Sequence, residues 1–142
     1  MYYGALEAGG TKMVCAIGDA DKNIIDIPTG TPDQSLPAMI DYFKKYDISA
    51  LGIGTFGPAD INPNSPTYGS IMRSPKKDWE GFSLYKAFTD ALGCLVVVDT
   101  DVNAAAWGEY LYGALKGLNS GMYLTVGTGI GGGIISDGRL IH

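Results

Sequence analysis

The sequence predicts an α/β fold, in which a mixed sheet with flanking helices is followed by the first hairpin of a second lobe. Two observations carry this prediction. A β-meander opens the chain and helix-and-strand units follow it, an order that favours a mixed sheet with helices packed against it. The chain then ends in a new strand, glycine turn and strand, similar in kind to its beginning. We therefore expect a first lobe at residues 1–117 and the truncated start of a second lobe at residues 118–142.

Short apolar runs between turn residues predict the first elements. The meander strands are expected at residues 2–8, 12–18 and 24–27. A helix is expected at residues 34–46, because its apolar side chains recur with helical spacing. These side chains are Leu36, Met39, Ile40 and Phe43. The apolar run at residues 50–56 is short and ends in turn residues, which indicates a strand buried on both faces.

Residues 57–81 have no periodicity and contain four prolines. An irregular connection of this length is usually functional or disordered. The elements expected after it are a helix at residues 84–92, a strand at 94–98, a helix at 101–117, and hairpin strands at 122–126 and 133–136. Trp79 and Phe82, beside the irregular connection, are interpreted as packing anchors rather than as platforms that stack on a sugar.

Composition restricts the classes of function. The 142 residues carry a formal net charge of −5, which argues against a nucleic-acid-binding surface because such surfaces are normally basic. With 46% hydrophobic and 18% charged residues, the chain can form an apolar core. No membrane span or signal peptide is expected, so the default location is cytoplasmic. Cys15 and Cys94 lie far apart in apolar runs, and we expect them to be buried free thiols.

Seven of the 21 glycines gather at two turns, and the first turn lies between the first two expected strands. Gly9 and Gly10 let backbone amides approach an anion closely. Thr11 adds a hydroxyl donor and Lys12 adds positive charge. Glu7, just before the turn, could face a Mg²⁺ held by that anion. An ordinary tight hairpin is the alternative, since the spacing is neither that of a Walker A loop nor that of a Rossmann fingerprint.

The second glycine cluster occupies residues 127–133, with Thr128 as its hydroxyl-bearing residue. Its lettering is like that of a dinucleotide-binding loop, but the residues after it have the pattern of a strand and not of a helix. A Rossmann interpretation is therefore weak, and a second phosphate-contacting hairpin fits better. A flexible glycine hairpin without such a function is the alternative.

Three polar residues, Asp99, Asp101 and Asn103, follow the strand at residues 94–98. Ligand-binding residues of α/β proteins gather at such strand-to-helix junctions. A carboxylate there could accept the proton of an attacking hydroxyl, while an amide binds a neighbouring hydroxyl in the same crevice. Capping of the following helix by Asp101 is the alternative. His142 is the single histidine, and we expect no catalytic or metal-binding role for it.

Four segments jointly resemble the ROK family of bacterial sugar kinases, and within it the fructokinases. The segments are EAGGTK at residues 7–12, GTFGPADI at 54–61, DTDVNAAAWGE at 99–109 and VGTGIGGGII at 126–135. The PKxxW pattern at residues 75–79 is similar to the fructokinase-like group. The resemblance implies the two-lobed, actin-like (ribonuclease H-like) ATPase fold, with ATP and sugar between the lobes. It also implies that this chain is an N-terminal lobe fragment.

The resemblance implies a role for each matched residue. Asp101 would be the catalytic base, and Gly57, Pro58 and Asn103 would lie near the sugar. The residues implied to bind MgATP are Glu7, Gly9, Gly10, Thr11, Lys12, Thr128, Gly129, Gly131 and Gly132. The implied reaction is phosphoryl transfer to the C6 hydroxyl of fructose, with little activity expected of the fragment alone. The structural zinc of the family is expected only in the missing lobe, and a homodimer is expected when the protein is full length.

Two alternatives remain open. A kinase for another hexose, such as glucose or N-acetylmannosamine, would share every motif quoted above. A non-catalytic, sugar-sensing ROK protein is the other alternative. Repressors of that kind carry a helix-turn-helix ahead of the kinase-like region, whereas the first phosphate motif here begins at residue 7, which disfavours them.

Overall fold

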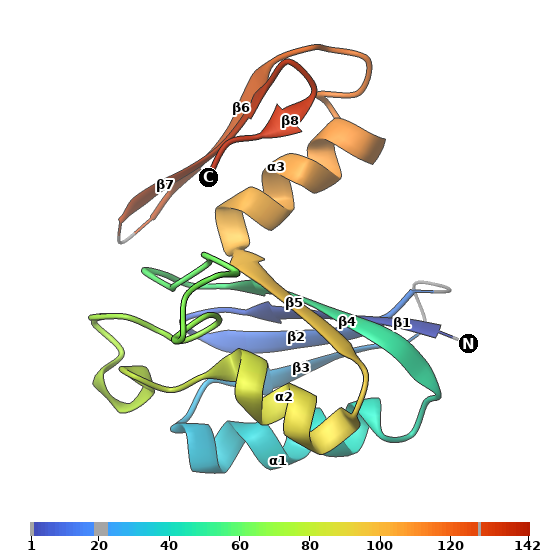
Figure 1. Ribbon diagram of the computed structural model, residues 1–142, viewed down its shortest axis with the longest axis vertical. Helices are drawn as coiled ribbons and strands as arrows, with labels where there is room; N and C mark the ends of the chain where they lie inside the picture. The colour runs from blue at the N-terminus through green and yellow to red at the C-terminus, as the bar shows by residue number, and fades with distance from the viewer. Residues whose placement is uncertain (1, 19–22, 128) are drawn as a thin grey trace. The chain divides into compact units, whose positions relative to one another are not determined.

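The computed structural model describes residues 2–18, 23–127 and 129–142, and the chain forms two compact units (Figure 1). The units are Met1–Thr100 and Asp101–His142. The third helix of the chain packs on the closing hairpin, so the structure groups it with that hairpin. The sequence analysis grouped it with the first lobe, because a helix after a strand reads as part of the same βα succession.

The first unit contains a five-stranded sheet with the order β3-β2-β1-β4-β5. Its strands are β1 (Tyr2–Ala8), β2 (Lys12–Ile17), β3 (Ile24–Pro28), β4 (Ile48–Thr55) and β5 (Leu95–Thr100). The three strands of the meander pair antiparallel, whereas β1, β4 and β5 pair parallel. The predicted mixed sheet is therefore confirmed, and the parallel strands β1, β4 and β5 end at the same edge.

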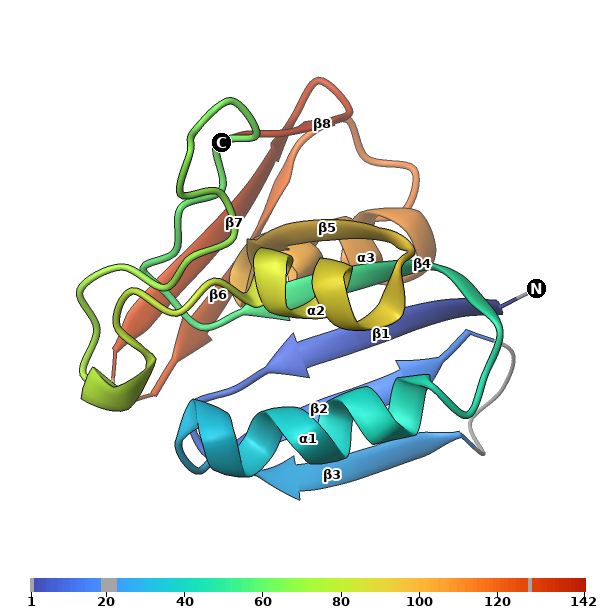
Figure 2. The same ribbon diagram turned by 60° about the horizontal axis from the view of Figure 1, so that its bottom comes forward.

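Two helices, α1 (Pro32–Phe43) and α2 (Leu84–Leu92), cover one face of this sheet (Figures 1 and 2). The first helix begins two residues earlier than predicted, because Thr31 forms its N-cap and Pro32 its first turn. The Thr31 N–H donates to Gln34 Oε1 over 3.0 Å, as in a capping box. The second helix has the predicted bounds and ends at Gly93, whose φ of 65° suits glycine.

The core of the first unit lies between the sheet and these two helices. Alternate side chains of the strands point into it, as a period of two requires, so Leu6 of β1 and Cys15 of β2 are buried. Phe43 and Phe88 of the helices close the core in an edge-on contact, with 6.1 Å between ring centroids. Met39 of α1 is also buried, as the helical spacing predicted.

The connection between β4 and α2 is ordered by its own contacts. It includes a short 3₁₀ helix, η1 (Lys77–Trp79), and two isolated bridges, Ala59↔Ile71 and Ser70↔Ser83. The Trp79 indole is 1% exposed and packs edge-on against Phe56 and Phe82. The prediction that Trp79 is a packing anchor is therefore confirmed.

The second unit packs one helix on a small sheet. Its elements are α3 (Asp101–Tyr112), β6 (Gly121–Val126), β7 (Ile130–Ser136) and β8 (Arg139–Leu140). Ala106 of α3 and Ile135 of β7 are buried, whereas Leu124, Val126 and Ile134 are 54%, 79% and 45% exposed. Helix α3 ends at Tyr112, before the predicted end at residue 117. Just beyond its last turn, Glu109 Oε2 accepts the Ala114 N–H over 2.7 Å, so a side chain replaces a helical carbonyl oxygen as the acceptor. Among the described residues, no helix has the length and apolar character to cross a membrane.

Candidate active site

The turn between β1 and β2 contains two glycines with different structural needs. The Gly9 N–H donates to the Lys12 carbonyl oxygen over 3.0 Å, and a Cβ atom on Gly9 would lie 2.5 Å from that same oxygen. The hairpin itself therefore requires glycine at position 9. At Gly10 φ is not positive, and the atom nearest to an added Cβ would be Lys76 Cε at 3.9 Å. The fold leaves position 10 open.

This turn presents backbone donors from a fixed position. Within the described part of the chain, the N–H groups of Gly10 and Thr11 have no hydrogen-bond partner. Thr29, which follows β3, holds the turn through two hydrogen bonds. Its hydroxyl donates to the Gly9 carbonyl oxygen over 2.8 Å, and its N–H donates to the Thr11 carbonyl oxygen over 3.0 Å. Adjacent free N–H groups on a held turn are suited to bind an anion.

Lys12 was predicted to supply the positive charge of this turn, and the structure gives its ammonium a carboxylate partner. Lys12 Nζ lies 2.6 Å from Asp26 Oδ2 of β3. The hydrogen bond and negative charge of Asp26 raise the pKa of Lys12 above its ordinary value. Asp26 was not among the predicted site residues. The position of Asp26 beside Lys12 depends on the register of β2 and β3, which a single sequence does not reveal.

Two carboxylates lie in one row of the sheet near the carboxyl ends of the parallel strands. Glu7 of β1 and Asp99 of β5 both pair in register with Gly54 of β4. Each adjoins a buried residue, so both side chains belong to the face opposite the helices. One or two carboxylates, together with phosphate oxygens and water, are the usual ligands of Mg²⁺. The predicted place of Glu7 near a nucleotide-bound Mg²⁺ fits this chemistry.

Gly57 and Pro58 begin the loop after β4. Because Thr55 pairs with Ala8, this loop and the glycine turn follow the ends of neighbouring strands. The Gly57–Pro58 peptide bond is cis, and the Pro58 carbonyl oxygen accepts the Met72 N–H over 2.8 Å. Further along, hydrogen bonds from the hydroxyls of Ser65 and Thr67 lower the pKa of Asp60. The loop predicted to lie near a sugar is therefore an ordered structure.

Asp101 and Asn103 lie in the first turn of α3. Asp101 Oδ1 accepts the N–H of Val102 over 2.9 Å, and the helix begins at Asp101 itself, so this residue is not its N-cap. Two positions along a helix correspond to about 200° around its axis. In agreement, Asn103 is 6% exposed while Asp101 is only half-buried. Their predicted roles as base and sugar ligand, in one crevice, remain predictions.

The second glycine run divides between a turn and a strand. Thr128 lies outside the described residues, and Gly129 is exposed beside it. Gly131 and Gly132 belong to β7, where Gly131 lies under α3: an added Cβ would come within 2.9 Å of Val102 Cγ1. Close packing of α3 explains glycine at position 131. Phosphate binding by Gly129, Gly131 and Gly132 remains a prediction.

The two cysteines differ in burial. Both are free thiols, as expected, but only Cys15 is fully buried, whereas Cys94 is half-buried and not buried as predicted. Burial raises the pKa of Cys15 to about 12. Among the described residues, no group of three or more His, Cys, Asp or Glu side chains gathers in a metal-binding arrangement.

One residue near the glycine turn was missed by the sequence analysis. Lys76 follows the buried Ser74 and precedes η1, and it was noted only as part of the PKxxW pattern. The signal that could have identified Lys76 is the pair of lysines in this pattern, which lies beside a tryptophan in a long irregular connection.

Comparison with known proteins identifies the family. The profile of the ROK family matches residues 3–142. A fructokinase of Lactococcus lactis subsp. cremoris is 46% identical over 144 residues, covering 99% of this chain and 49% of the relative. A fructokinase of Zymomonas mobilis is 40% identical over 149 residues, covering 99% of this chain and 50% of the relative. The chain belongs to the ROK family, and it spans about half the length of the curated relatives that it matches.

Solved structures agree with this assignment. A ROK family glucokinase from Streptomyces griseus, in complex with glucose and AMPPNP, superposes with a TM-score of 0.77 at 29% identity. The superposition covers 99% of this chain and 46% of the glucokinase. The predicted actin-like ATPase fold, with its mixed sheet and flanking helices, is confirmed.

Proposed function

We propose that the protein containing this sequence is an ATP-dependent kinase that phosphorylates the C6 hydroxyl of fructose. The observation that carries the proposal is the held turn at Gly9–Lys12, where two N–H groups beside an open glycine position have no partner among the described residues. Fructokinases at 46% and 40% identity support the substrate, and a related glucokinase with a bound ATP analogue supports the nucleotide.

The first unit supplies groups that suit the phosphates of MgATP, which provides the phosphoryl group to be transferred. The N–H groups of Gly10 and Thr11 bind phosphate oxygens, since they point from a turn that Thr29 holds in place. Glu7 lies in β1 on the same face of the sheet as Asp99, and its carboxylate would help to hold the Mg²⁺ that accompanies ATP. Catalysis of phosphoryl transfer consists mainly of such positioning and charge stabilisation.

Asp101 is proposed as the base that accepts the proton of the sugar hydroxyl. Its carboxylate belongs to the first turn of α3, directly after the last strand of the first unit, and it uses one oxygen to accept the Val102 N–H. That hydrogen bond fixes the side chain while the second oxygen can accept the proton. Asn103 and the loop at Gly57 and Pro58 are proposed to contact the sugar.

A kinase specific for another hexose is the second candidate. The specific observation that favours it is the similarity to a glucokinase whose structure contains glucose. The motifs matched here are shared by kinases for fructose, glucose and N-acetylmannosamine, so they do not discriminate between these sugars. A non-catalytic sugar sensor, which would bind the sugar without turning it over, is a further alternative. For the assembled enzyme we propose a homodimer.

An ATP-consumption assay with a panel of hexoses tests the proposed function. The enzyme should be produced from its complete reading frame and assayed with fructose, glucose, mannose and N-acetylmannosamine. The highest kcat/KM is expected for fructose. A higher value for another hexose would reassign the substrate, and sugar binding without ATP consumption would favour the sensor.

Asp101→Asn tests the proposed base in the same assay. We expect sugar binding to persist while kcat falls by at least about 100-fold, the usual effect of losing a general base. Asp90→Asn is the matched control, since its carboxylate belongs to an exposed ion pair with Lys86 and has no proposed role in the reaction. Near-native turnover of Asp101→Asn would remove Asp101 from the mechanism.

A further inference from the structure

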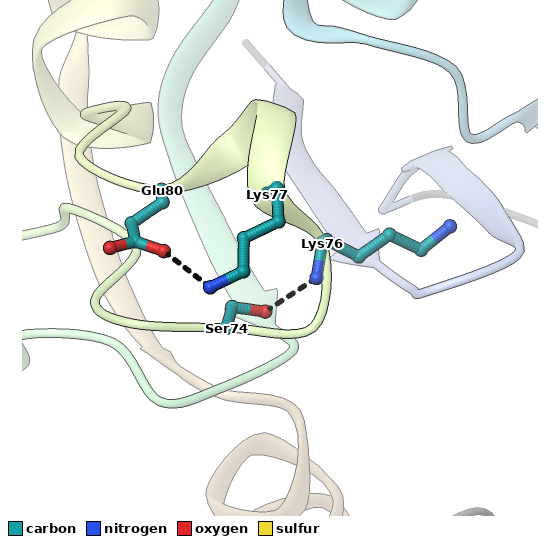
Figure 3. A network of polar contacts seen from close by, with 4 residues as sticks. All are labelled: Ser74, Lys76, Lys77 and Glu80. Carbon is teal, nitrogen blue, oxygen red and sulfur yellow. Dashed lines mark hydrogen bonds and ion pairs between the residues drawn. The ribbon is translucent and has the colours of Figure 1, made fainter.

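Lys76 directs its side chain at the glycine turn from a distant part of the sequence. Its Cε atom lies 3.9 Å from the position that a Cβ would take on Gly10. Figure 3 shows this side chain extending away from Lys77 and Glu80, towards the ribbon of the N-terminal strands. Lys76 is half-buried, unlike the exposed Lys77 beside it.

The backbone that carries Lys76 is fixed on both sides. Its N–H donates over 3.2 Å to the hydroxyl of Ser74, a residue that is 3% exposed. Three residues later, the buried Trp79 donates through its indole nitrogen to the Gly30 carbonyl oxygen over 2.8 Å. Gly30 adjoins Thr29, which holds the glycine turn. The segment of Lys76 and the glycine turn are therefore anchored on the same loop.

In the part of the chain that the structure describes, no carboxylate pairs with the Lys76 ammonium. Lys12 Nζ is 2.6 Å from Asp26, and Lys77 Nζ is 3.2 Å from Glu80. Among the described residues, Lys76 Nζ has no hydrogen-bond or ion-pair partner. Of the two lysines nearest to Gly10, Lys76 is thus the one whose ammonium is available to a ligand.

We infer that Lys76 binds the phosphoryl group that is transferred, together with the N–H groups of Gly10 and Thr11. This inference rests on the proposed kinase function. A lysine ammonium is a compact charge with three donors, which suits phosphate oxygens. Two backbone donors, at Gly10 and Thr11, and the ammonium of Lys76, whose Cε lies 3.9 Å from the Cβ position of Gly10, would then share the phosphate. The ammonium of Lys12 is paired with Asp26 instead.

The test compares Lys76→Met with Lys77→Met in the enzyme produced from its complete reading frame. Both changes remove one positive charge from the same short segment. We expect Lys76→Met to lower kcat/KM for ATP by about 10- to 100-fold, as loss of a charged hydrogen bond implies. Lys77→Met should stay within about twofold of wild type, because its ammonium belongs to an exposed ion pair. Lys76→Arg should recover part of the loss.

A binding measurement separates this inference from the proposed function. Inorganic pyrophosphate is titrated calorimetrically into each variant with Mg²⁺ present, and fructose is titrated separately. We expect Lys76→Met to weaken pyrophosphate binding and to leave fructose binding unchanged, whether or not the wild type turns over. Equal pyrophosphate affinity in Lys76→Met and Lys77→Met would overturn the role of Lys76. Wild-type protein that binds pyrophosphate through Lys76 but phosphorylates no sugar would overturn only the proposed function.

Discussion

The Gly9 N–H donates to the Lys12 carbonyl oxygen over 3.0 Å, and this same oxygen leaves no room for a side chain on Gly9. One residue further on, the restriction ends, because among the described residues an added Cβ on Gly10 would meet only Lys76 Cε, at 3.9 Å. Two adjacent glycines of one motif therefore have separate reasons to be glycine. The first closes the hairpin, and the second leaves space in front of two backbone donors.

This difference predicts that alanine at position 9 lowers the stability of the protein, whereas alanine at position 10 weakens its use of ATP. Gly9→Ala should lower the free energy of unfolding by about 1–3 kcal/mol, as overpacking against backbone does. Gly10→Ala should change stability by less than about 0.5 kcal/mol and raise the KM for ATP, because its methyl group enters the phosphate space. Urea denaturation and ATP kinetics of both variants check this. A stable Gly9→Ala, or a Gly10→Ala with unchanged ATP kinetics, would contradict the assignment.

The glycines of β7 give a second matched pair. An added Cβ on Gly133 would collide with the Val102 carbonyl oxygen and come within 2.8 Å of Ala106 Cβ, both in α3. On the opposite face, a Cβ on Gly132 would meet the flexible end of Leu124 at 3.3 Å. We expect Gly133→Ala to destabilise the enzyme by about 1–3 kcal/mol. Gly132→Ala should change stability by less than about 0.5 kcal/mol in the same urea titration.

The two cysteines should differ in reactivity. Cys15 is fully buried and its pKa is raised to about 12 by that burial, whereas Cys94 is half-buried. The thiolate is the reactive form. A thiol reagent at pH 8 should therefore label Cys94 first and Cys15 only after unfolding. In Cys94→Ser, peptide mapping of the folded protein should find no rapid labelling at Cys15, and rapid labelling of Cys15 in this variant would contradict its burial.

Cys15 also predicts a dependence of stability on pH. Its pKa in the folded chain, about 12, lies above the ordinary value of 9.0, so folding favours the neutral thiol. This contribution is complete below pH 9 and is lost as the pH rises from 9 towards 12. The free energy of unfolding should fall over that interval more steeply in the wild type than in Cys15→Ala. Parallel curves for the two proteins would contradict the prediction.

Local patterns in the sequence predicted the fold well. The alternation of Leu6 and Ala8 with exposed neighbours marks a strand, and α2 has the predicted bounds because a serine cap and a terminal glycine enclose its apolar face. The start of α1 was misplaced, since its capping residues precede the apolar positions that were used to find it. The sequence analysis grouped the third helix with the preceding strand, whereas the structure groups it with the closing hairpin. The close packing of Gly133 on α3, which explains the difference, cannot be inferred from the order of elements along the chain.

The candidate site was predicted less completely, because its decisive contacts join residues far apart in the chain. Sequence reasoning identified the glycine turn and Glu7 from residue types alone. It assigned the phosphate charge to Lys12, whose partner Asp26 is 14 positions away on the next strand. It omitted Lys76, which approaches Gly10 from a segment that the Trp79–Gly30 hydrogen bond anchors across the fold.

Phosphorus NMR of the reaction mixture tests the central claim most directly. The enzyme produced from its complete reading frame is incubated with fructose and MgATP, and the position of the new phosphate ester is read from its coupling to the sugar protons. We expect a phosphate ester on C6 of fructose, formed together with one equivalent of ADP, and formation at least about 100-fold slower when Asp101→Asn replaces the wild type. Unchanged ATP, an ester at another carbon, or equal product from Asp101→Asn would contradict it.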